Sequence, residues 1–147
     1  MQRDSNKRLP SFQKPNADRS RNMQAIRSSK NISTEMRLAS LLRKNRIRGW
    51  RRHQSNILGK PDFFFRRRRL AIFVDGCFFH GCPRCGHVPK TNRSYWAAKI
   101  RRNKARDLSV SRKLRKRRIR VVRMWECRLR NSPGTCLNRI IRSLAQN

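Results

Sequence analysis

Five acidic residues are the positions of this sequence with the clearest chemical potential. The 147-residue chain has only seven Asp and Glu against 40 Lys and Arg, and two of the seven lie in a polar N-terminal stretch. The other five are Glu35, Asp62, Asp75, Asp107 and Glu126. A surface that only attracts phosphate groups has no use for carboxylates, whereas carboxylate oxygens are preferred ligands of Mg²⁺. These acids are therefore the first candidates for a metal site in so basic a chain.

Asp62 and Asp75 have a spacing that suits one shared site. Asp62 opens an aromatic run and Asp75 ends the next branched run, with twelve residues between them. The two runs are joined by four arginines and predict a hairpin of central strands. Carboxylates at the start of one strand and the end of its partner approach one point, where they can hold Mg²⁺ for phosphodiester hydrolysis. The spacing alone also fits two aspartates that only end strands in turns.

Four cysteines have a spacing that suits zinc, because three lie within nine residues and one follows a later predicted strand. They are Cys77, Cys82, Cys85 and Cys127. Structural zinc takes four Cys or His ligands in a tetrahedron, whereas catalytic zinc keeps one position open. A four-thiolate site would therefore be structural, with His87 as an alternative ligand to Cys85; free thiols are the other interpretation. The fifth cysteine, Cys136, lies on an apolar helical stripe and is predicted to be in the core.

His80 and Asp107 are candidates for proton transfer. His80 follows Cys77 by three residues, so a zinc site would fix its position. A neutral imidazole beside a phosphate can act as a general base, although His80 also fits a further zinc ligand or a plain loop residue. Asp107 shares one face of a predicted helix with Trp96 and Ile100. A carboxylate on an inward face needs a partner, either an arginine or an imidazole that it orients.

Aromatic residues lie among the basic ones around the cysteine-containing loop. They are Phe78, Phe79, Tyr95 and Trp96. Such side chains can stack on bases or wedge between base pairs. Packing in the core is an equally good interpretation of each residue taken alone.

The charge of the chain indicates a polyanionic partner. The formal net charge is +33 and the sequence pI is about 12.0, which favours nucleic acid or an anionic surface. The longest strictly apolar run, residues 70–74, is far too short to span a bilayer, and the first residues lack a signal-peptide pattern. We therefore expect a nucleic-acid partner, an intracellular location and no membrane association.

Periodicity predicts seven elements that would position these residues. The expected helices cover residues 33–49, 94–117 and 133–144, and the expected strands cover residues 50–54, 62–65, 70–74 and 119–125. Ser33 and Ser132 are the expected N-caps, with Pro133 opening the last helix. Its expected buried stripe is Leu137, Ile140, Ile141 and Leu144. This order predicts an α/β fold with one mixed β-sheet flanked by helices.

The predicted organisation is one domain preceded by an arm. Residues 1–20 are polar and basic, so we expect a disordered arm, and residues 21–147 are enough for a single domain with its own core. A short helix at residues 21–27 would display Met23 and Ile26.

Taken in order, these motifs resemble the very short patch repair endonuclease family over roughly residues 18–130. The motifs are Arg21-Asn22-Met23, Glu35-x-Arg37-Leu38, Gly59-Lys60-Pro61-Asp62-Phe63, Val74-Asp75-Gly76-Cys77-Phe78-Phe79-His80-Gly81-Cys82-Pro83, Val88-Pro89-Lys90-Thr91-Asn92-Arg93 and Trp125-Glu126-Cys127. The resemblance implies a restriction-endonuclease-like fold. It also implies an enzyme that nicks one strand 5′ to the T of a T:G mismatch, which arises by deamination of 5-methylcytosine.

The resemblance implies a role for each matching residue. Asp62 and the backbone carbonyl of Val74 would hold catalytic Mg²⁺, His80 would be the catalytic histidine, and Asp107 and Glu35 would support the site. The structural zinc would bind Cys77, Cys82, Cys85 and Cys127. The DNA wedge would be Phe78, Phe79 and Trp96, with Met23 and Ile26 inserting from the minor groove. Asp75 stands where related nucleases carry lysine, so it would bind metal through water or hydrogen-bond His80.

The expected partner is double-stranded DNA with a T:G mismatch, and the expected enzyme is a cytoplasmic, nucleoid-associated monomer from a prokaryote. Mismatch-repair proteins and a repair polymerase are expected further partners. Two alternatives remain: a related DNase of other specificity, and a non-catalytic, zinc-containing nucleic-acid-binding protein in which the aspartates are turn residues.

Overall fold

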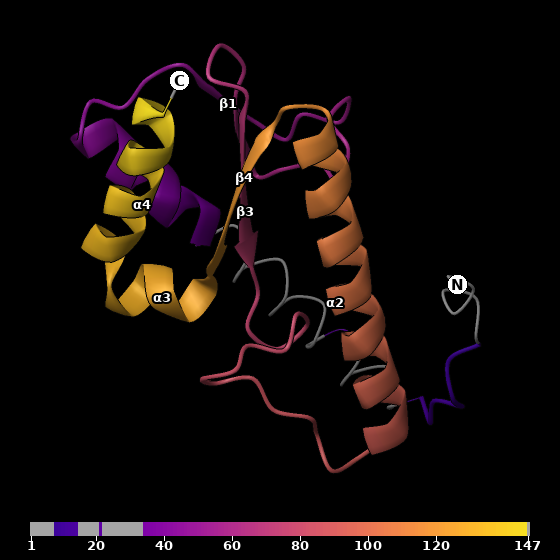
Figure 1. Cartoon of the computed structure of the whole chain (residues 1–147). Helices are drawn as coiled ribbons and strands as arrows, with labels where there is room; N and C mark the ends of the chain where they lie inside the picture. Colours follow the sequence, from indigo (N-terminus) through magenta and orange to yellow (C-terminus); the bar gives the residue numbers. More distant parts are fainter. Residues whose placement is uncertain (1–7, 15–20, 22–33, 147) are drawn as a thin grey trace.

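The computed structural model describes residues 8–14, 21 and 34–146, and a four-stranded mixed sheet organises this region (Figure 1). Its strands are β1 (Trp50–Arg52), β2 (Phe63–Phe65), β3 (Leu70–Asp75) and β4 (Arg120–Trp125), in that spatial order. The first three strands pair antiparallel, whereas β3 and β4 pair parallel. The long helix α2 (Arg93–Lys116) makes the connection between the two parallel strands. The predicted mixed α/β sheet, its β2–β3 hairpin and its long helix are confirmed.

Side chains alternate between the two faces of the sheet along each strand, and both faces carry apolar residues. Helices therefore cover both faces. Phe63, Phe65 and Ile72 point to one face, where they pack against the helix of residues 34–44 and against α4 (Pro133–Ala145). Phe64 and Phe73 point to the other face, where α2 covers them. Figure 1 shows this arrangement, with α2 on one side of the sheet and α3 (Glu126–Asn131) and α4 on the other.

The parallel register of β3 and β4 places the candidate site residues at one end of the sheet, where both strands finish. Asp75 at the end of β3 lies opposite Trp125 at the end of β4. The cysteine-containing loop leaves from the first of these strand ends, and Glu126 and Cys127 follow the second. Residues about fifty positions apart in the sequence are therefore neighbours.

Several local predictions were wrong. The helix of residues 34–44 ends before a turn in which Arg46 has a left-handed φ of 55°, rather than continuing to Gly49. Helix α3 was not predicted, because six residues are too few to show a helical period. The side chain of Ser132 makes no capping hydrogen bond, although Pro133 does open α4. Ile141 is 44% exposed rather than buried.

Some expectations concern residues outside the described part of the chain. These are the Ser33 cap, the short helix with Met23 and Ile26, and most of the N-terminal arm. Among the described residues, no helix has the length and apolar character needed to cross a membrane.

Candidate active site and metal centre

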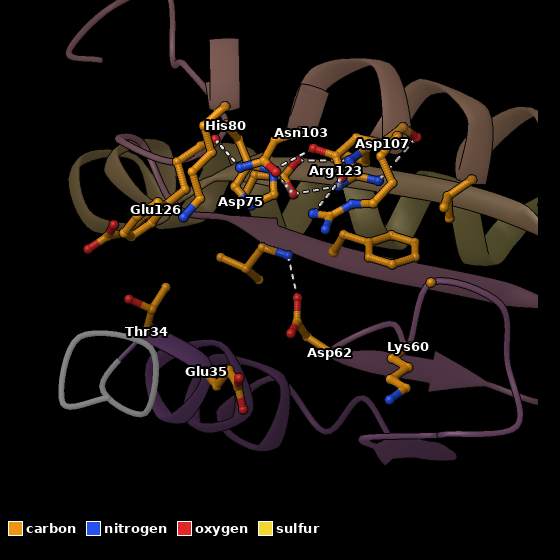
Figure 2. A pocket seen from close by; sticks show the side chains of 18 residues that line it. Thr34, Glu35, Lys60, Asp62, Asp75, His80, Asn103, Asp107, Arg123 and Glu126 are labelled. Carbon is orange, nitrogen blue, oxygen red and sulfur yellow. Dashed lines mark hydrogen bonds and ion pairs between the residues drawn. The ribbon is translucent and has the colours of Figure 1, made fainter. Parts of the chain in front are cut away.

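All five acidic residues of the described region line a single pocket of about 700 Å³. Figure 2 shows Glu35 and Asp62 on one side of it and Asp75, His80, Arg123 and Asp107 on the other. Basic side chains share the lining, among them Lys60, Lys99 and Arg106. An acidic centre within a basic rim suits a ligand that is itself anionic but requires a cation at one point.

Asp62 is a half-buried carboxylate without a cationic partner among the described residues. It follows a tight turn in which Gly59 and Lys60 both have positive φ, and its Oδ2 accepts a hydrogen bond of 2.7 Å from the backbone N–H of Val74. Burial raises the pKa of Asp62 to about 6, and the negative charges of Glu35 and Asp75 add to the effect of burial. The charge of His53 acts in the opposite direction but does not outweigh burial, and a half-buried anion without an ion pair is one that a bound metal ion would stabilise.

Glu35 is held beside Asp62 by two basic residues. Its Oε2 accepts a hydrogen bond of 2.5 Å from Nη2 of Arg52 and lies 3.0 Å from Nε2 of His53. His53 has a left-handed φ of 49°, which is uncommon for a residue other than glycine. Glu35 thus enters the pocket from the helix of residues 34–44 while the end of β1 fixes its carboxylate.

His80, Asp107, Arg123 and Asp75 form one hydrogen-bonded network opposite Asp62. Nδ1 of His80 contacts Oδ2 of Asp107. Arg123 binds both oxygens of Asp75, at 2.8 and 2.7 Å, and its Nη2 also lies 3.1 Å from Oδ1 of Asp107. Although burial acts to raise the pKa of Asp107, the neighbouring His80 and Arg123 outweigh it and lower that pKa. Asp107 is therefore ionised at neutral pH.

The same network explains the tautomer of His80. An ionised carboxylate can only accept a hydrogen bond, so Nδ1 of His80 carries the proton that faces Asp107. In the neutral imidazole, Nε2 is then left with a lone pair. Asp75, His80 and Asp107 could hold a metal by ligand type, but the Arg123 guanidinium already supplies the positive charge between the two carboxylates.

The loop that carries His80 is fixed on α2. Nδ2 of Asn103 donates a hydrogen bond of 2.8 Å to the carbonyl of Phe79. Gly81 has a φ of 62°, and a Cβ at this position would lie 2.7 Å from Cγ2 of Ile100 and 2.6 Å from Cε of Lys104. Glycine is therefore required where the loop passes closest to the helix.

Four cysteine sulfurs gather at the end of the sheet behind this loop. Those of Cys77, Cys82, Cys85 and Cys127 lie within 4.8 Å of one another. The sulfurs of Cys82 and Cys127 are 3.7 Å apart. Tetrahedral zinc with Zn–S bonds of about 2.3 Å requires sulfurs about 3.8 Å apart, so the spacing fits the metal. The structure brings Cys85 into the cluster rather than His87, whose ring instead lies 6.1 Å from that of Phe78. Cys136 is buried in the core, as predicted.

Hydrogen bonds from backbone N–H groups hold the cysteine loop in shape independently of any metal. The N–H of Cys127 points at the sulfur of Cys77, 3.4 Å away, and the N–H of Gly86 donates to the carbonyl of Cys82. A Cβ on Gly86 would lie 2.6 Å from backbone atoms of Cys82. Burial acts to raise the pKa of Cys82, but the N–H groups of Arg84 and Cys85 lower it to about 7, which favours the thiolate that metals bind. Burial raises the pKa of the neighbouring Cys77, so this thiol would lose its proton on binding a metal.

The aromatic residues form one cluster beside the pocket. The ring centroids of Phe78 and Phe79 are 4.9 Å apart, and that of Phe78 is 5.1 Å from Trp96. Trp96 is only 6% exposed, whereas both phenylalanines are half-buried. The sequence did not indicate a further member, Phe12, whose ring lies 4.6 Å from that of Tyr95.

The sequence interpretation missed one residue of the pocket, Arg123, and left another, Glu126, without a role. Arg123 was one of many arginines on a predicted strand, and only the parallel β3–β4 pairing brings it to Asp75. Glu126 had no assigned role and lines the pocket, with an ion pair of 2.7 Å to Arg130. Its position one residue before Cys127 was the available signal, because a fixed cysteine also fixes its neighbour.

Comparisons with known proteins identify the family of this chain. A family model described as DNA mismatch endonuclease Vsr matches residues 12–85. The type II nicking enzyme V.NaeI of Lentzea aerocolonigenes is 44% identical over 118 residues, covering 76% of this chain and 69% of the relative. The type II nicking enzyme V.XorIIP of Xanthomonas oryzae pv. oryzae is 42% identical over 109 residues, covering 73% and 78%. DNA mismatch endonuclease Vsr of Escherichia coli is 38% identical over 116 residues, covering 78% and 72%. The chain therefore belongs to the DNA mismatch endonuclease Vsr family, and the protein is a DNA endonuclease.

Proposed function

We propose that this endonuclease nicks one DNA strand 5′ to the T of a T:G mismatch, with Mg²⁺ as the catalytic metal and zinc in a structural role. One observation carries the proposal. A half-buried carboxylate without an ion-pair partner among the described residues, Asp62, faces an imidazole oriented by a carboxylate, His80 with Asp107, across one pocket. The named relatives support the same reaction class, and the proposed fold is of the restriction-endonuclease type.

Asp62 and the backbone carbonyl of Val74 would hold the Mg²⁺. The uncompensated charge of Asp62 fits this ion, because carboxylate and carbonyl oxygens are its usual protein ligands. When bound, Mg²⁺ supplies charge stabilisation at a phosphoryl oxygen and lowers the pKa of water. Glu35, which Arg52 and His53 hold in place, lies near enough to influence Asp62 and supports the same site.

His80 would remove the proton from the attacking water. Its Nδ1 proton faces Asp107, so its Nε2 presents a lone pair for this step, and Asp107 stabilises the imidazolium that forms. Arg123 holds Asp107 and Asp75 together, so Asp75 acts on His80 from a distance of 3.8 Å rather than as a metal ligand.

The aromatic cluster would select the mismatch. Half-buried Phe78 and Phe79 can enter the base stack. Trp96 was expected in the wedge with them, but it is only 6% exposed and would instead support them by packing against Phe78. Unstacking costs least where base pairing is already poor, so insertion favours a T:G pair over a matched one. Met23 and Ile26 would insert from the minor groove.

A duplex assay tests this function. We expect single-turnover nicking of a T:G duplex in Mg²⁺ to exceed that of the matched duplex by at least roughly 10²-fold, which corresponds to about 3 kcal/mol of unstacking cost. Nicking should occur on the T strand only. Equal nicking of both duplexes would instead indicate a nicking enzyme without mismatch specificity, and intact strands in every reaction would indicate a DNA-binding protein.

Asp107→Asn tests the role of the imidazole. An Asn side chain can donate to Nδ1 of His80, which moves the ring proton to Nε2 and removes the base. We expect the single-turnover rate to fall by roughly 10²- to 10⁴-fold at unchanged DNA affinity. Asp107→Glu, which keeps the acceptor, should recover part of the rate. A wild-type rate in Asp107→Asn would exclude His80 as the base.

A further inference from the structure

Two basic turns meet at the end of the sheet that lies away from the pocket. Parallel pairing of β3 and β4 places the β2–β3 turn, residues 66–69, beside the α2–β4 turn at residues 117–118. The side chain of Arg69 donates hydrogen bonds to the carbonyls of Arg117 and Arg118, at 2.5 and 3.1 Å. Arg120 donates a bond of 2.7 Å to the carbonyl of Arg68. The two turns thus form one fixed surface.

This surface, which we call the basic end, concentrates exposed positive charge. It consists of Arg66, Arg67, Arg68, Arg69 and the helix-side residues Arg112, Lys113, Arg115, Lys116, Arg117 and Arg118. Every acidic residue of the described region lines the pocket instead, so no described carboxylate neutralises the basic end. Like charges at this density repel one another and disfavour the folded state unless an anion binds.

Structural roles account for only part of this charge. Arg69 and Arg120 hold the turns together, and basic residues in the last turn of α2 complement the helix dipole. Neither reason applies to Arg66, Arg67 or Arg68. Arg118 has a left-handed φ of 57°, where glycine or asparagine would be less strained. The side chain of Arg118 is exposed, and the acidic residues of the described region all line the pocket instead.

The distance between the pocket and the basic end fits a DNA duplex that extends out of the pocket. Arg117 lies ten residues after Asp107 along α2, a distance of about 15 Å at the helical rise of about 1.5 Å per residue. From Asp75 back to Leu70 is five residues of strand, or about 17 Å. At about 3.4 Å per base pair, both values correspond to four or five base pairs.

We propose that the basic end binds the phosphate backbone of the duplex four to five base pairs from the nicked bond, on one flank only. This proposal rests on the DNA endonuclease function and adds a second contact region to it. Because the contacts are to phosphate, they are independent of sequence and sensitive to salt. Their effect is on DNA affinity, whereas the chemistry in the pocket is unchanged.

The test uses a triple variant that removes the charge of the β2–β3 turn, Arg66→Gln/Arg67→Gln/Arg68→Gln. The matched control is the triple variant that keeps the charge, Arg66→Lys/Arg67→Lys/Arg68→Lys. Dissociation constants are measured for a 30-base-pair duplex with Ca²⁺ in place of Mg²⁺, over a range of salt. Each lost phosphate contact lowers the slope of log K against log salt by about 0.9, so we expect a decrease of about 2 to 3 for the glutamine variant. The lysine variant should keep the wild-type slope, because a phosphate contact requires charge rather than a guanidinium.

Trimmed duplexes locate the contact. Shortening one flank to three base pairs should abolish the difference between the glutamine variant and wild type, whereas shortening the other flank should preserve it. An unchanged slope in the glutamine variant would overturn the proposal. So would a difference that survives trimming of both flanks, or a stoichiometry of two duplexes per chain, which would indicate a separate DNA site. Binding is measured without cleavage, so these outcomes are independent of mismatch specificity and of the Mg²⁺ site.

Discussion

Asp62→Asn is expected to abolish nicking and, at the same time, to stabilise the metal-free protein. Loss of the proposed Mg²⁺ ligand removes several kcal/mol of charge stabilisation from the transition state, so we expect the single-turnover rate to fall by at least roughly 10³-fold. Asparagine is the informative replacement, because its Oδ1 can still accept the hydrogen bond from the N–H of Val74. Alanine would leave that partly buried N–H without the partner it has in the wild type, and the two effects could not be separated.

The stabilisation follows from the direction of the pKa shift. Burial raises the pKa of Asp62 from 3.8 to about 6, so the folded state holds the proton more tightly than the unfolded state does. Metal-free wild type therefore loses stability as the pH rises from about 4 to about 6, and the full penalty is present above pH 6. Asparagine carries no charge and escapes this penalty. At pH 8 we expect the variant to be more stable by about 1–3 kcal/mol.

Thermal unfolding of both proteins with EDTA and with Mg²⁺ provides the measurement. Mg²⁺ should raise the melting temperature of wild type and leave that of Asp62→Asn unchanged, because the ion binds only the folded site. Asp107→Asn is the matched control, since its pKa is lowered in the folded state and its ionised form is stabilising. That control should lose activity and also lose stability at pH 8. If Asp62→Asn were less stable than wild type at pH 8 without metal, the uncompensated charge at this position would be disproved.

The sequence predicts the residues of this site better than it predicts their partners. Asp62, His80 and the four clustered cysteines stand out because their types and local spacing already suit metal and proton chemistry. The hairpin strands and α2 can also be predicted from local sequence, because the alternation of a strand and the periodicity of a helix are visible within each segment alone. The pairing of Asp75 with Arg123 is different, because it depends on two strands 48 residues apart lying parallel and in one register.

The sequence left open whether Asp107 would pair with an arginine or with an imidazole, and the structure shows both. Its carboxylate contacts His80 through one oxygen and Arg123 through the other. A helical stripe places Asp107 on the inward face of α2, but it cannot say which loop and which strand that face meets. Tertiary packing makes that choice, so the orienting role of Asp107 follows only from the assembled structure.

Removal of the proposed zinc is expected to destabilise the whole domain and to inactivate the enzyme, although the cysteine cluster lies outside the pocket. The cluster joins the loop that carries His80 to Cys127 at the start of α3, so one ion would tie together segments about fifty residues apart. Without it, no metal bonds hold the four sulfurs, which lie within 4.8 Å of one another, and the loop is released from Cys127. We expect the free energy of unfolding to fall by about 5 kcal/mol and the melting temperature by roughly 15 °C.

Two cysteine variants separate this effect from the general loss of a thiol. Cys82→Ser should reduce the zinc content well below one ion per chain, lower the melting temperature and slow nicking together, because His80 lies two residues before Cys82. Cys136→Ala removes a cysteine that is also buried but is not one of the four clustered sulfurs, so it should retain one zinc per chain and wild-type nicking. The cavity it leaves lowers stability by only about 1 kcal/mol. A full complement of zinc in Cys82→Ser would contradict the four-thiolate site, because three remaining sulfurs and a hydroxyl make a much weaker ligand set.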